Sequence, residues 1–341
     1  MQYEVLSLDA PRETTNAHVD MRFRHVAHLF HLEWHGIRSA TSCLPGHKIG
    51  ITADRNLDGD TLRRLIGFIY ENNIKHVICQ GYSLNADLAI RAMNANFKSN
   101  INLHVISHLT STQFENYFEV EMQKYILKAL QDKIVRKIAS VKPNFNSVIS
   151  QYWPKLIINC TPALRGMYRH SSADPGYAFV PLENTIRKNL YTNILAALDT
   201  DMISEVLTVN DPSGLGNIRD LQKCRTIGFQ RGRQLLERMA DASVVMNCTL
   251  AECQPMTQLE ALAVGTPCMT GRLGIEELND HPLTKMTEVE IVDNPAHITK
   301  QVEALITTRR GDPENFDALL KGYVEFRNGL AIDRLADFVG I

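Results

Sequence analysis

The chain has 341 residues, of which 44% are hydrophobic and 22% are charged, with 36 Lys and Arg against 38 Asp and Glu. These proportions are typical of a globular protein and exclude a disordered, a collagen-like or a membrane-embedded chain. At roughly 150 residues per domain, the length predicts about two domains. The seven cysteines are scattered and form no Cys-x-x-Cys pair, which favours free thiols in a reducing compartment over a disulfide framework.

Charge and histidine are unevenly distributed along the chain. Residues 1–163 hold 18 basic and 14 acidic residues, a balance of +4, together with 9 of the 12 histidines. The remaining residues hold 18 basic and 24 acidic side chains, a balance of −6. The nearly neutral total excludes a strongly basic nucleic-acid-binding protein, whereas the basic first half favours an anionic partner.

In the first half, apolar runs of strand length alternate with amphipathic segments of helix length. The pattern predicts helices over His18–Trp34, Asp60–Asn72, Asn85–Ala95 and most of Gln113–Ala139, and strands over Gly36–Thr41, Lys48–Thr52, His76–Cys79 and Leu103–Ser107. Such alternation is typical of a parallel sheet that helices cover on both faces.

The pattern restarts after Pro154. It predicts strands over Lys155–Asn159, Ala178–Pro181, Val206–Val209, Arg225–Phe229 and Ser243–Asn247, and helices over Lys188–Leu198, Arg231–Ala240 and Gln258–Val264. The polar stretch Leu164–Pro175 contains Gly, Ser and Pro and predicts a linker. The last thirty residues predict a helix with an interruption at Gly329.

We therefore expect an α/β protein with two Rossmann-like domains facing a central cleft. The expected boundaries are 1–163 for the first domain and 164–320 for the second. A C-terminal helix over 321–341 is expected to pack back on the first domain.

The most informative stretch runs from Ala240 to Pro267. A predicted strand leads through a short loop into a helix that begins near Pro255 and ends at Gly265. Loops at the carboxyl edge of a parallel sheet are where ligands bind in open α/β folds. The free backbone amides at the helix start, around Met256 and Thr257, suit a phosphate group.

Two glutamates in this stretch, Glu252 and Glu260, are separated by seven residues. From the residues alone, Glu260 forms a capping box with Thr257, and Glu252 is a solvated loop carboxylate. The surrounding pattern, however, resembles the donor-binding motif of GT-B retaining glycosyltransferases of the family-4 type. In that motif Glu-x7-Glu is followed by Ala-x-Ala-x-Gly-x-Pro. The matching residues are Ala240, Asp241, Val244, Glu252, Glu260, Ala261, Ala263, Gly265 and Pro267.

The resemblance implies a catalytic role for Glu252, in contact with the donor sugar, and a contact between Glu260 and the nucleotide ribose. It also implies a GT-B fold, with Met256 and Thr257 on the donor. The chain departs from the family at Cys253–Thr257, where the family usually has Gly-Phe-Gly-Leu-Pro. Without those glycines, close approach of the backbone to the sugar is less assured.

A second match lies upstream, where Phe179–Ala197 resembles the first strand, loop and helix of the same donor domain. There an Arg and a Lys grip the donor diphosphate, because the departing nucleoside diphosphate gains negative charge in the transition state. The resemblance implies this role for Lys188, which aligns directly, and for Arg187. The family usually places its arginine some five residues earlier. From the residues alone, the pair is a solvated helix start, where basic charge opposes the macrodipole.

Two further residues take their expected roles from the resemblance. Cys224–Gln230 resembles the family's strand that ends in Gly-Phe, which places the loop after Phe229 near the nucleobase. His108 follows a predicted strand, where the family often carries an active-site histidine near the reacting sugar. Without the family, such a histidine is a hydrogen-bonded structural residue. The first half of the chain resembles the family's N-terminal domain only weakly, since Glu13–Ala17 replaces the Gly-Gly loop of that domain.

Two patterns outside these motifs bear on partners. Four histidines fall on one face of the first predicted helix, and they favour a polar face toward a cleft or a phosphate, with a metal site as the alternative. They are His25, His28, His31 and His35. The segment Met122–Val141 interleaves basic and apolar residues, which is typical of a solvated face on a packed helix or of a membrane-surface helix. Its basic residues are Lys124, Lys128, Lys133, Arg136 and Lys137.

The expected function is therefore a retaining hexosyl- or pentosyltransferase that needs no metal or other cofactor and takes a UDP-, GDP- or ADP-sugar as donor. The acceptor is a polysaccharide, lipid, protein or modified nucleic acid, and the basic first domain favours an anionic acceptor or a peripheral membrane surface. A nucleotide-sugar epimerase on the same fold and an inactive GT-B binding or assembly subunit are the alternatives. The oligomeric state stays open. The N-terminus lacks a basic n-region, which predicts a cytoplasmic protein, with the inner membrane face as an alternative location.

Overall fold

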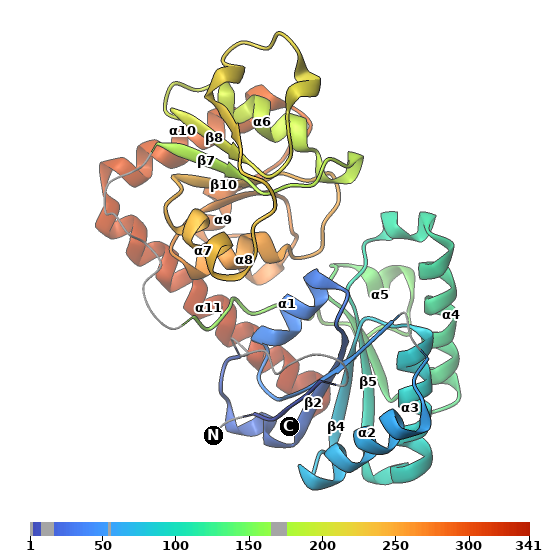
Figure 1. Cartoon of the computed structure of the whole chain (residues 1–341). Coiled ribbons are helices and arrows are strands. Elements are labelled where there is room, and N and C mark those ends of the chain that lie inside the picture. The colour runs from blue at the N-terminus through green and yellow to red at the C-terminus, as the bar shows by residue number, and fades with distance from the viewer. Residues whose placement is uncertain (1–2, 8–16, 54–55, 165–175) are drawn as a thin grey trace. The chain divides into compact units, whose positions relative to one another are not determined.

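The computed structural model of the chain describes residues 3–7, 17–53, 56–164 and 176–341 (Figure 1). It contains two compact units, which we describe separately. The first unit comprises Met1–Ala163 and Asn328–Ile341, and the second comprises Leu164–Arg327. The 27-residue helix α11 (Pro313–Val339) begins in the second unit and ends in the first. Because α11 runs through Gly329 without a break, the predicted interruption there is wrong.

Two segments that the sequence analysis singled out lie outside the described residues. They are the predicted linker, except for Leu164, and the segment that replaces the Gly-Gly loop, except for Ala17.

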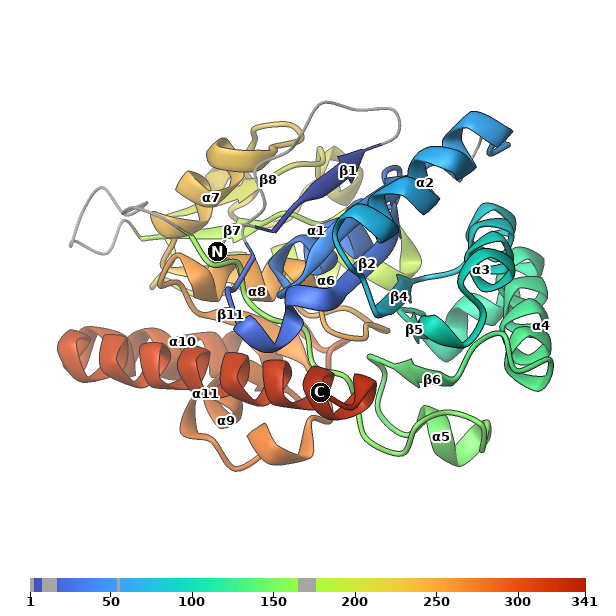
Figure 2. The ribbon, with the colours of Figure 1, turned by 90° about the horizontal axis from the view of Figure 1, so that it is seen from below.

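The first unit contains a sheet of six parallel strands in the order β1-β3-β2-β4-β5-β6. The strands are β1 (Val5–Ser7), β2 (Val26–His31), β3 (His47–Ile51), β4 (His76–Gln80), β5 (Asn102–Ser107) and β6 (Lys137–Ser140). Its helices are α1 (His35–Cys43), α2 (Gly59–Glu71), α3 (Leu84–Phe97), α4 (Tyr117–Gln131) and the short α5 (Phe145–Val148). Helices α3 and α4 lie side by side in both views (Figures 1 and 2). The strand order reverses between β2 and β4, which creates a topological switch point.

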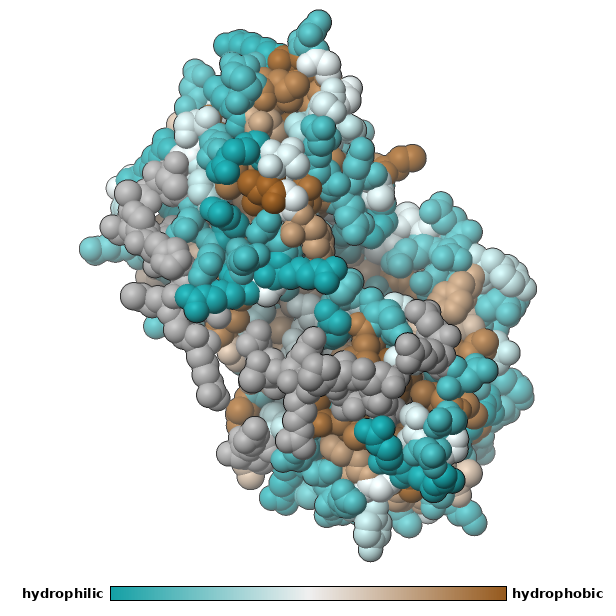
Figure 3. All heavy atoms as spheres, viewed as in Figure 1, coloured by the Kyte–Doolittle hydropathy of each residue, from teal (hydrophilic) through white to brown (hydrophobic). Residues whose placement is uncertain are grey.

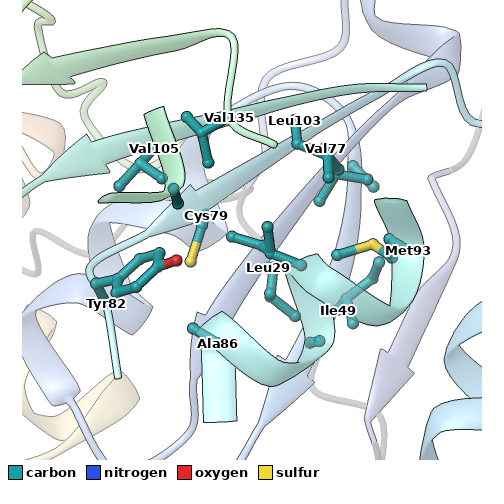
Figure 4. Packing of buried hydrophobic residues seen from close by; sticks show 14 of the residues in the cluster. Leu29, Ile49, Val77, Cys79, Tyr82, Ala86, Met93, Leu103, Val105 and Val135 are labelled. Atoms are coloured by element: carbon teal, nitrogen blue, oxygen red, sulfur yellow. The ribbon is translucent and has the colours of Figure 1, made fainter. Parts of the chain in front are cut away.

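The two faces of this sheet differ in polarity. On one face, Leu29, Val77 and Val105 pack with Met93 of α3 and further apolar residues into a continuous core (Figure 4). The strand residues between them point to the opposite face. These include four buried polar side chains, His28, Lys48, Gln80 and His104. Parallel strands are usually apolar throughout, so each of these polar groups needs a hydrogen-bond partner or a ligand.

The sequence analysis predicted the first helix and the first long strand of this unit in the wrong order. In place of the predicted helix His18–Trp34, the structure has a short 3₁₀ helix, η1 (Met21–His25), followed by strand β2. Helix α1 replaces the predicted strand Gly36–Thr41. Every residue of β2 is buried, including its two histidines, His28 and His31. These histidines point to opposite sides of the sheet, although their spacing in the sequence resembles that of a helix.

The segment Gln113–Ala139 is helical for most of its length, as predicted. Helix α4 ends at Gln131, because the chain turns at Lys133, which has a left-handed φ of 59°, and continues as β6. The predicted strand Lys155–Asn159 is wrong, since that segment is irregular backbone.

The second unit repeats the same architecture, with six parallel strands in the order β12-β11-β10-β7-β8-β9. The strands are β7 (Tyr177–Val180), β8 (Glu205–Thr208), β9 (Cys224–Thr226), β10 (Val244–Asn247), β11 (Cys268–Gly271) and β12 (Glu288–Val289). Its helices are α6 (Leu190–Leu198), α7 (Gly232–Ala240), α8 (Met256–Ala263), α9 (Pro282–Thr287) and α10 (Pro295–Gly311). The order reverses between β7 and β10. Two parallel sheets covered by helices confirm the predicted α/β class with two Rossmann-like folds.

Among the described residues, no helix is both long and apolar enough to cross a bilayer. Polar side chains cover most of the face shown in Figure 3, and apolar side chains appear there in separate patches. The apolar residues of Met122–Val141 pack into or against the core of the first unit; they are Ile126, Leu127, Leu130, Ile134 and Ile138. The membrane-surface helix is therefore wrong for this segment, and its basic residues belong to a packed element.

Candidate functional site

The candidate site lies at the switch point of the second unit, where the loops after β7 and β10 meet. After β7 the chain forms a short 3₁₀ helix, η4 (Ile186–Lys188), and the Thr185 side chain accepts a hydrogen bond from the Lys188 backbone. Asn189 follows with a left-handed φ of 55°, and α6 then begins. This turn projects two consecutive basic residues from the carboxyl edge of the sheet, the edge where ligands bind in such folds.

The structure brings together three of the predicted site residues, Arg187, Lys188 and Glu252. Lys188 Nζ lies 2.8 Å from Glu252 Oε2, and Arg187 Nη1 lies 3.4 Å from the same oxygen. Arg187 Nη1 also donates a hydrogen bond to the Ala251 carbonyl, at 3.0 Å. The side chains of Lys188 and Glu252 are only 21% and 19% exposed, so solvent screens their attraction less than it screens a surface pair. The two cations and the carboxylate thus lie close together in a place that solvent reaches only in part.

Two asparagines of the first loop and helix hold the second loop in place. Asn189 Nδ2 donates to the carbonyls of Cys248 (3.1 Å) and Val292 (2.6 Å). Asn193, which is fully buried in α6, donates to the Cys248 carbonyl and accepts from the Cys248 amide, at 3.0 and 2.9 Å. The Leu250 amide completes the connection by donating to the Arg187 carbonyl. Sequence analysis missed these asparagines, although a lone Asn inside an apolar helix was an available signal.

A buried arginine supports the same loop from α11. Arg327 has no exposed surface, and its Nη2 donates to Gln254 Oε1 at 2.9 Å, two residues beyond Glu252. A buried guanidinium requires such partners. Burial also raises the pKa of Glu288 to about 7, which the nearby charges of Arg327 and Arg272 only partly oppose. Sequence analysis gave no sign of Arg327.

Helix α8 begins directly after this loop, with Pro255 as its N-cap and no side-chain capping bond. Thr257 is the second residue of the helix, so the capping-box interpretation of Thr257 and Glu260 is wrong. Met256 and Glu260 are four residues apart and share one helix face. The first-turn amides of α8 supply positive charge at the end of the loop that carries Glu252.

The remaining predicted donor residue, Phe229, lies beyond the edge strand β9, two strands away from β7. Its ring is 65% exposed, and the Arg231 guanidinium lies over it, 5.0 Å from the ring centre. An exposed aromatic ring with a cation on one face can stack with a planar group on the other.

His108 belongs to the first unit and ends a chain of hydrogen-bonded side chains. Its Nε2 lies 2.7 Å from Gln80 Oε1, and Gln80 Nε2 donates to His28 Nδ1 at 3.0 Å. His28 Nε2 in turn lies 2.9 Å from the Pro45 carbonyl. Gln80 Oε1 and the Pro45 carbonyl oxygen can only accept hydrogen bonds. The imidazoles of His108 and His28 therefore carry their protons on Nε2. Burial lowers the pKa of His108 to about 4, so the ring is neutral near pH 7.

The four histidines of the predicted helical face do not converge. His28 and His31 stand three residues apart in β2 and therefore point to opposite faces, while His25 ends η1 and His35 begins α1. His31 Nε2 lies 2.6 Å from the Ser83 hydroxyl, away from the partners of His28. Within the described parts of the chain, no group of three or more His, Cys, Asp or Glu side chains could hold a metal ion.

Comparison with known proteins identifies the fold. No protein-family model matches the sequence, and no curated protein matches it. Several solved structures do match it. HepE from Anabaena, in complex with UDP, has 12% identity and a TM-score of 0.58 over 92% of this chain and 99% of that chain.

Two further structures resemble the chain over most of its length. The pneumococcal O-GlcNAc transferase GtfA, in complex with UDP and GlcNAc, has 12% identity and a TM-score of 0.52 over 81% of this chain. The present chain spans only 59% of GtfA. A Listeria monocytogenes protein assigned as a UDP-N-acetylglucosamine 2-epimerase has 13% identity and a TM-score of 0.51, over 91% and 94% of the two chains. The chain therefore has the GT-B fold that its motifs implied.

Proposed function

We propose that this protein is a glycosyltransferase that moves a sugar from a nucleotide-sugar to an acceptor, with retention of configuration and without a metal ion. The observation that carries the proposal is the ion cluster of Arg187, Lys188 and Glu252 at the switch point of the second unit. The GT-B structures of HepE and GtfA contain UDP, which makes UDP-sugars the first donors to test.

The charges of the cluster fit a nucleoside diphosphate. Without a donor, the Glu252 carboxylate is the shared anionic partner of both cations, and the cluster keeps a net positive charge. When a donor binds, its diphosphate oxygens replace the carboxylate as partners of Lys188 and Arg187, and Glu252 then accepts hydrogen bonds from the sugar hydroxyls. The first amides of α8, at Met256 and Thr257, add further donors for phosphate oxygens.

The proposed reaction breaks the bond between the anomeric carbon and the phosphate oxygen. The acceptor hydroxyl attacks the same face of the sugar, and its proton passes to the departing phosphate oxygen. Lys188 and Arg187 stabilise the charge that this oxygen gains, which is the interaction that strengthens in the transition state. Glu260 contacts the ribose in this proposal, and Phe229 lies beside the nucleobase. The first unit recognises the acceptor, with the neutral His108 imidazole as a hydrogen-bonding group near the reacting sugar.

The test is a screen of the full chain for nucleoside diphosphate release from UDP-, GDP- and ADP-sugars, followed by the Glu252→Ala variant on the active donor. We expect turnover to fall by at least about 100-fold, the effect of losing one preorganised transition-state contact. Glu205→Ala is the matched control, because it also breaks an Arg–Glu ion pair of the second unit. Glu205 Oε1 lies 2.6 Å from Arg225 Nε, at the opposite edge of the sheet. Unchanged turnover of Glu252→Ala would contradict the proposal.

Two other functions would give different results in the same experiment. A nucleotide-sugar epimerase, which the fold of the Listeria protein makes the second candidate, would convert the donor without any acceptor. An inactive binding subunit, which the replacement of the family's Gly-rich loop by Cys253–Thr257 favours, would show no turnover with any donor. NMR of the anomeric proton of the product tests retention, and activity in the presence of EDTA tests the proposed independence from metal.

A further inference from the structure

The first unit contains a basic cavity at the amino edge of its sheet. The cavity has a volume of about 890 Å³ and is lined by the first residues of β4, β5 and β6, the end of α4 and the last residues of α11. Five of its lining side chains are basic or imidazole groups, and none is acidic: His76, His104, Lys133, Arg136 and Lys137. His108 follows the opposite, carboxyl end of β5. The basic cavity is therefore separate from the edge where sugar chemistry is proposed.

His104 is the deepest polar group of the basic cavity. Only 2% of its surface is exposed, and among the described residues neither of its ring nitrogens has a hydrogen-bond partner. Its ring is stacked parallel to that of His76, with the centres 5.9 Å apart, and also contacts Phe338. A neutral imidazole has one donor and one acceptor nitrogen. Since buried polar groups are nearly always satisfied, the N–H of His104 points to a ligand atom that accepts a hydrogen bond.

None of the ion pairs in the described part of the chain includes Lys133, Arg136 or Lys137. The Asp337 carboxylate, which pairs with Lys155, also interacts electrostatically with Lys137. Lys137 Nζ donates to the Phe338 carbonyl at 2.8 Å, and the other two side chains are exposed to solvent. Burial, followed by the charges of nearby cations and His76, lowers the pKa of His104 to about 3, which agrees with a positive potential in the cavity.

We propose that the basic cavity binds a phosphate-bearing ligand whose oxygens accept hydrogen bonds from His104, Arg136 and Lys133. A phosphate monoester carries a charge of about −1.5 to −2 near pH 7. One of its oxygens can accept a hydrogen bond from the N–H of His104, while the cations balance its charge. The phosphate belongs either to a small soluble molecule or to the headgroup of a lipid.

Lys133 provides a variant that removes charge without endangering the fold. Its φ of 59° lies in the left-handed region, which favours glycine over residues with a side chain. Lys133→Gly therefore deletes a cation while relieving backbone strain. Lys98 also has a positive φ, of 47°, and does not line the basic cavity. Lys98→Gly is thus a control matched in charge, in residue type and in the sign of φ.

The experiment is a calorimetric titration of the full chain with inorganic phosphate at pH 6 and low ionic strength. The double variant Lys133→Gly, Arg136→Gln should bind at least about tenfold more weakly, because hydrogen bonds to charged groups are among the strong ones. Lys98→Gly should bind as the unchanged chain does. Lys188→Ala should retain this binding as well, so the result does not depend on the donor site proposed above.

A second arm distinguishes the two sources of the phosphate. The chain is sedimented with vesicles of phosphatidylcholine, with and without phosphatidic acid. If the chain binds inorganic phosphate and the double variant binds it more weakly, the ligand is a soluble phosphate compound. If the chain sediments only with vesicles that contain phosphatidic acid, and the double variant does so less, the ligand is a lipid headgroup. If the chain binds neither probe, or if the double variant binds both as well as the unchanged chain does, the proposal is overturned.

Discussion

The two units share one strand topology but place their polar groups differently. In the first unit, imidazoles stand inside the sheet or directly at its edge, and burial lowers the pKa values of His28, His31, His104 and His108. In the second unit, side chains that form ion pairs project from loops beyond the sheet. Polar groups within a sheet are coupled to folding, whereas groups on loops are coupled mainly to ligands. Substitutions should therefore affect stability in the first unit and activity in the second.

The largest expected effect concerns acid. The pKa values of His31 and His108 lie at about 4 in the folded chain, and that of His104 lies at about 3. Unfolding restores a value near 6.5, so the unfolded state binds more protons between about pH 6.5 and 4. The free energy of unfolding of the first unit therefore falls as pH falls through this window, by up to about 3 kcal/mol for each histidine.

Glu288 makes the second unit respond in the opposite direction. Burial raises its pKa to about 7, so in this case the folded state binds more protons between about pH 7 and 4.5, and acidification stabilises the fold. Both tryptophans, Trp34 and Trp153, belong to the first unit. Tryptophan fluorescence should therefore report unfolding on acidification, while amide hydrogen exchange shows the strands of the second unit still protected. Simultaneous unfolding of both units would remove this distinction between them.

The second prediction concerns Lys188 and Arg187. Lys188→Ala should lower turnover by about 10²- to 10³-fold, the effect of removing one preorganised charge contact from a transition state. Arg187→Ala should have a smaller effect, because Arg187 lies farther from Glu252 and is more exposed, at 37%. In both variants the thermal midpoint should change by less than about 4 °C, since loops carry these side chains.

Arg225→Ala is the control for both variants, because Arg225 forms an exposed ion pair with Glu205 in the same unit. It should retain full turnover. A Lys188→Ala enzyme with normal turnover would show that the ion cluster is structural.

The smallest expected effect comes from His104. Replacing it with leucine removes a buried group whose ring nitrogens have no partners among the described residues, so His104→Leu should raise the free energy of unfolding by about 1 to 2 kcal/mol at pH 7. Denaturant titration monitored by tryptophan fluorescence measures this change. A loss of stability instead would mean that the imidazole contributes to folding through its contacts with His76 and Phe338.

Local sequence patterns predicted the α/β fold class. The resemblance to the GT-B donor motifs singled out Glu252 and Lys188, whereas the residues alone indicated a solvated loop carboxylate and a solvated helix start. The roles of these residues stay predictions. The long-range supports could not be predicted, because Asn193 bonds to a residue 55 positions away and Arg327 to one 73 positions away. Strand β2 was missed because a strand buried on both faces carries no period of two.

Helix α11 has a consequence for biosynthesis. Residues 328–341 belong to the first unit, yet the ribosome makes them only after the whole second unit. At about 5 to 20 residues per second, the earlier part of the first unit waits about 10 to 30 s for this segment. During that interval Thr161 lacks Asn328, and Lys137 lacks the Phe338 carbonyl. The second unit can thus complete its fold on the ribosome first, and the unit begun earlier is finished last.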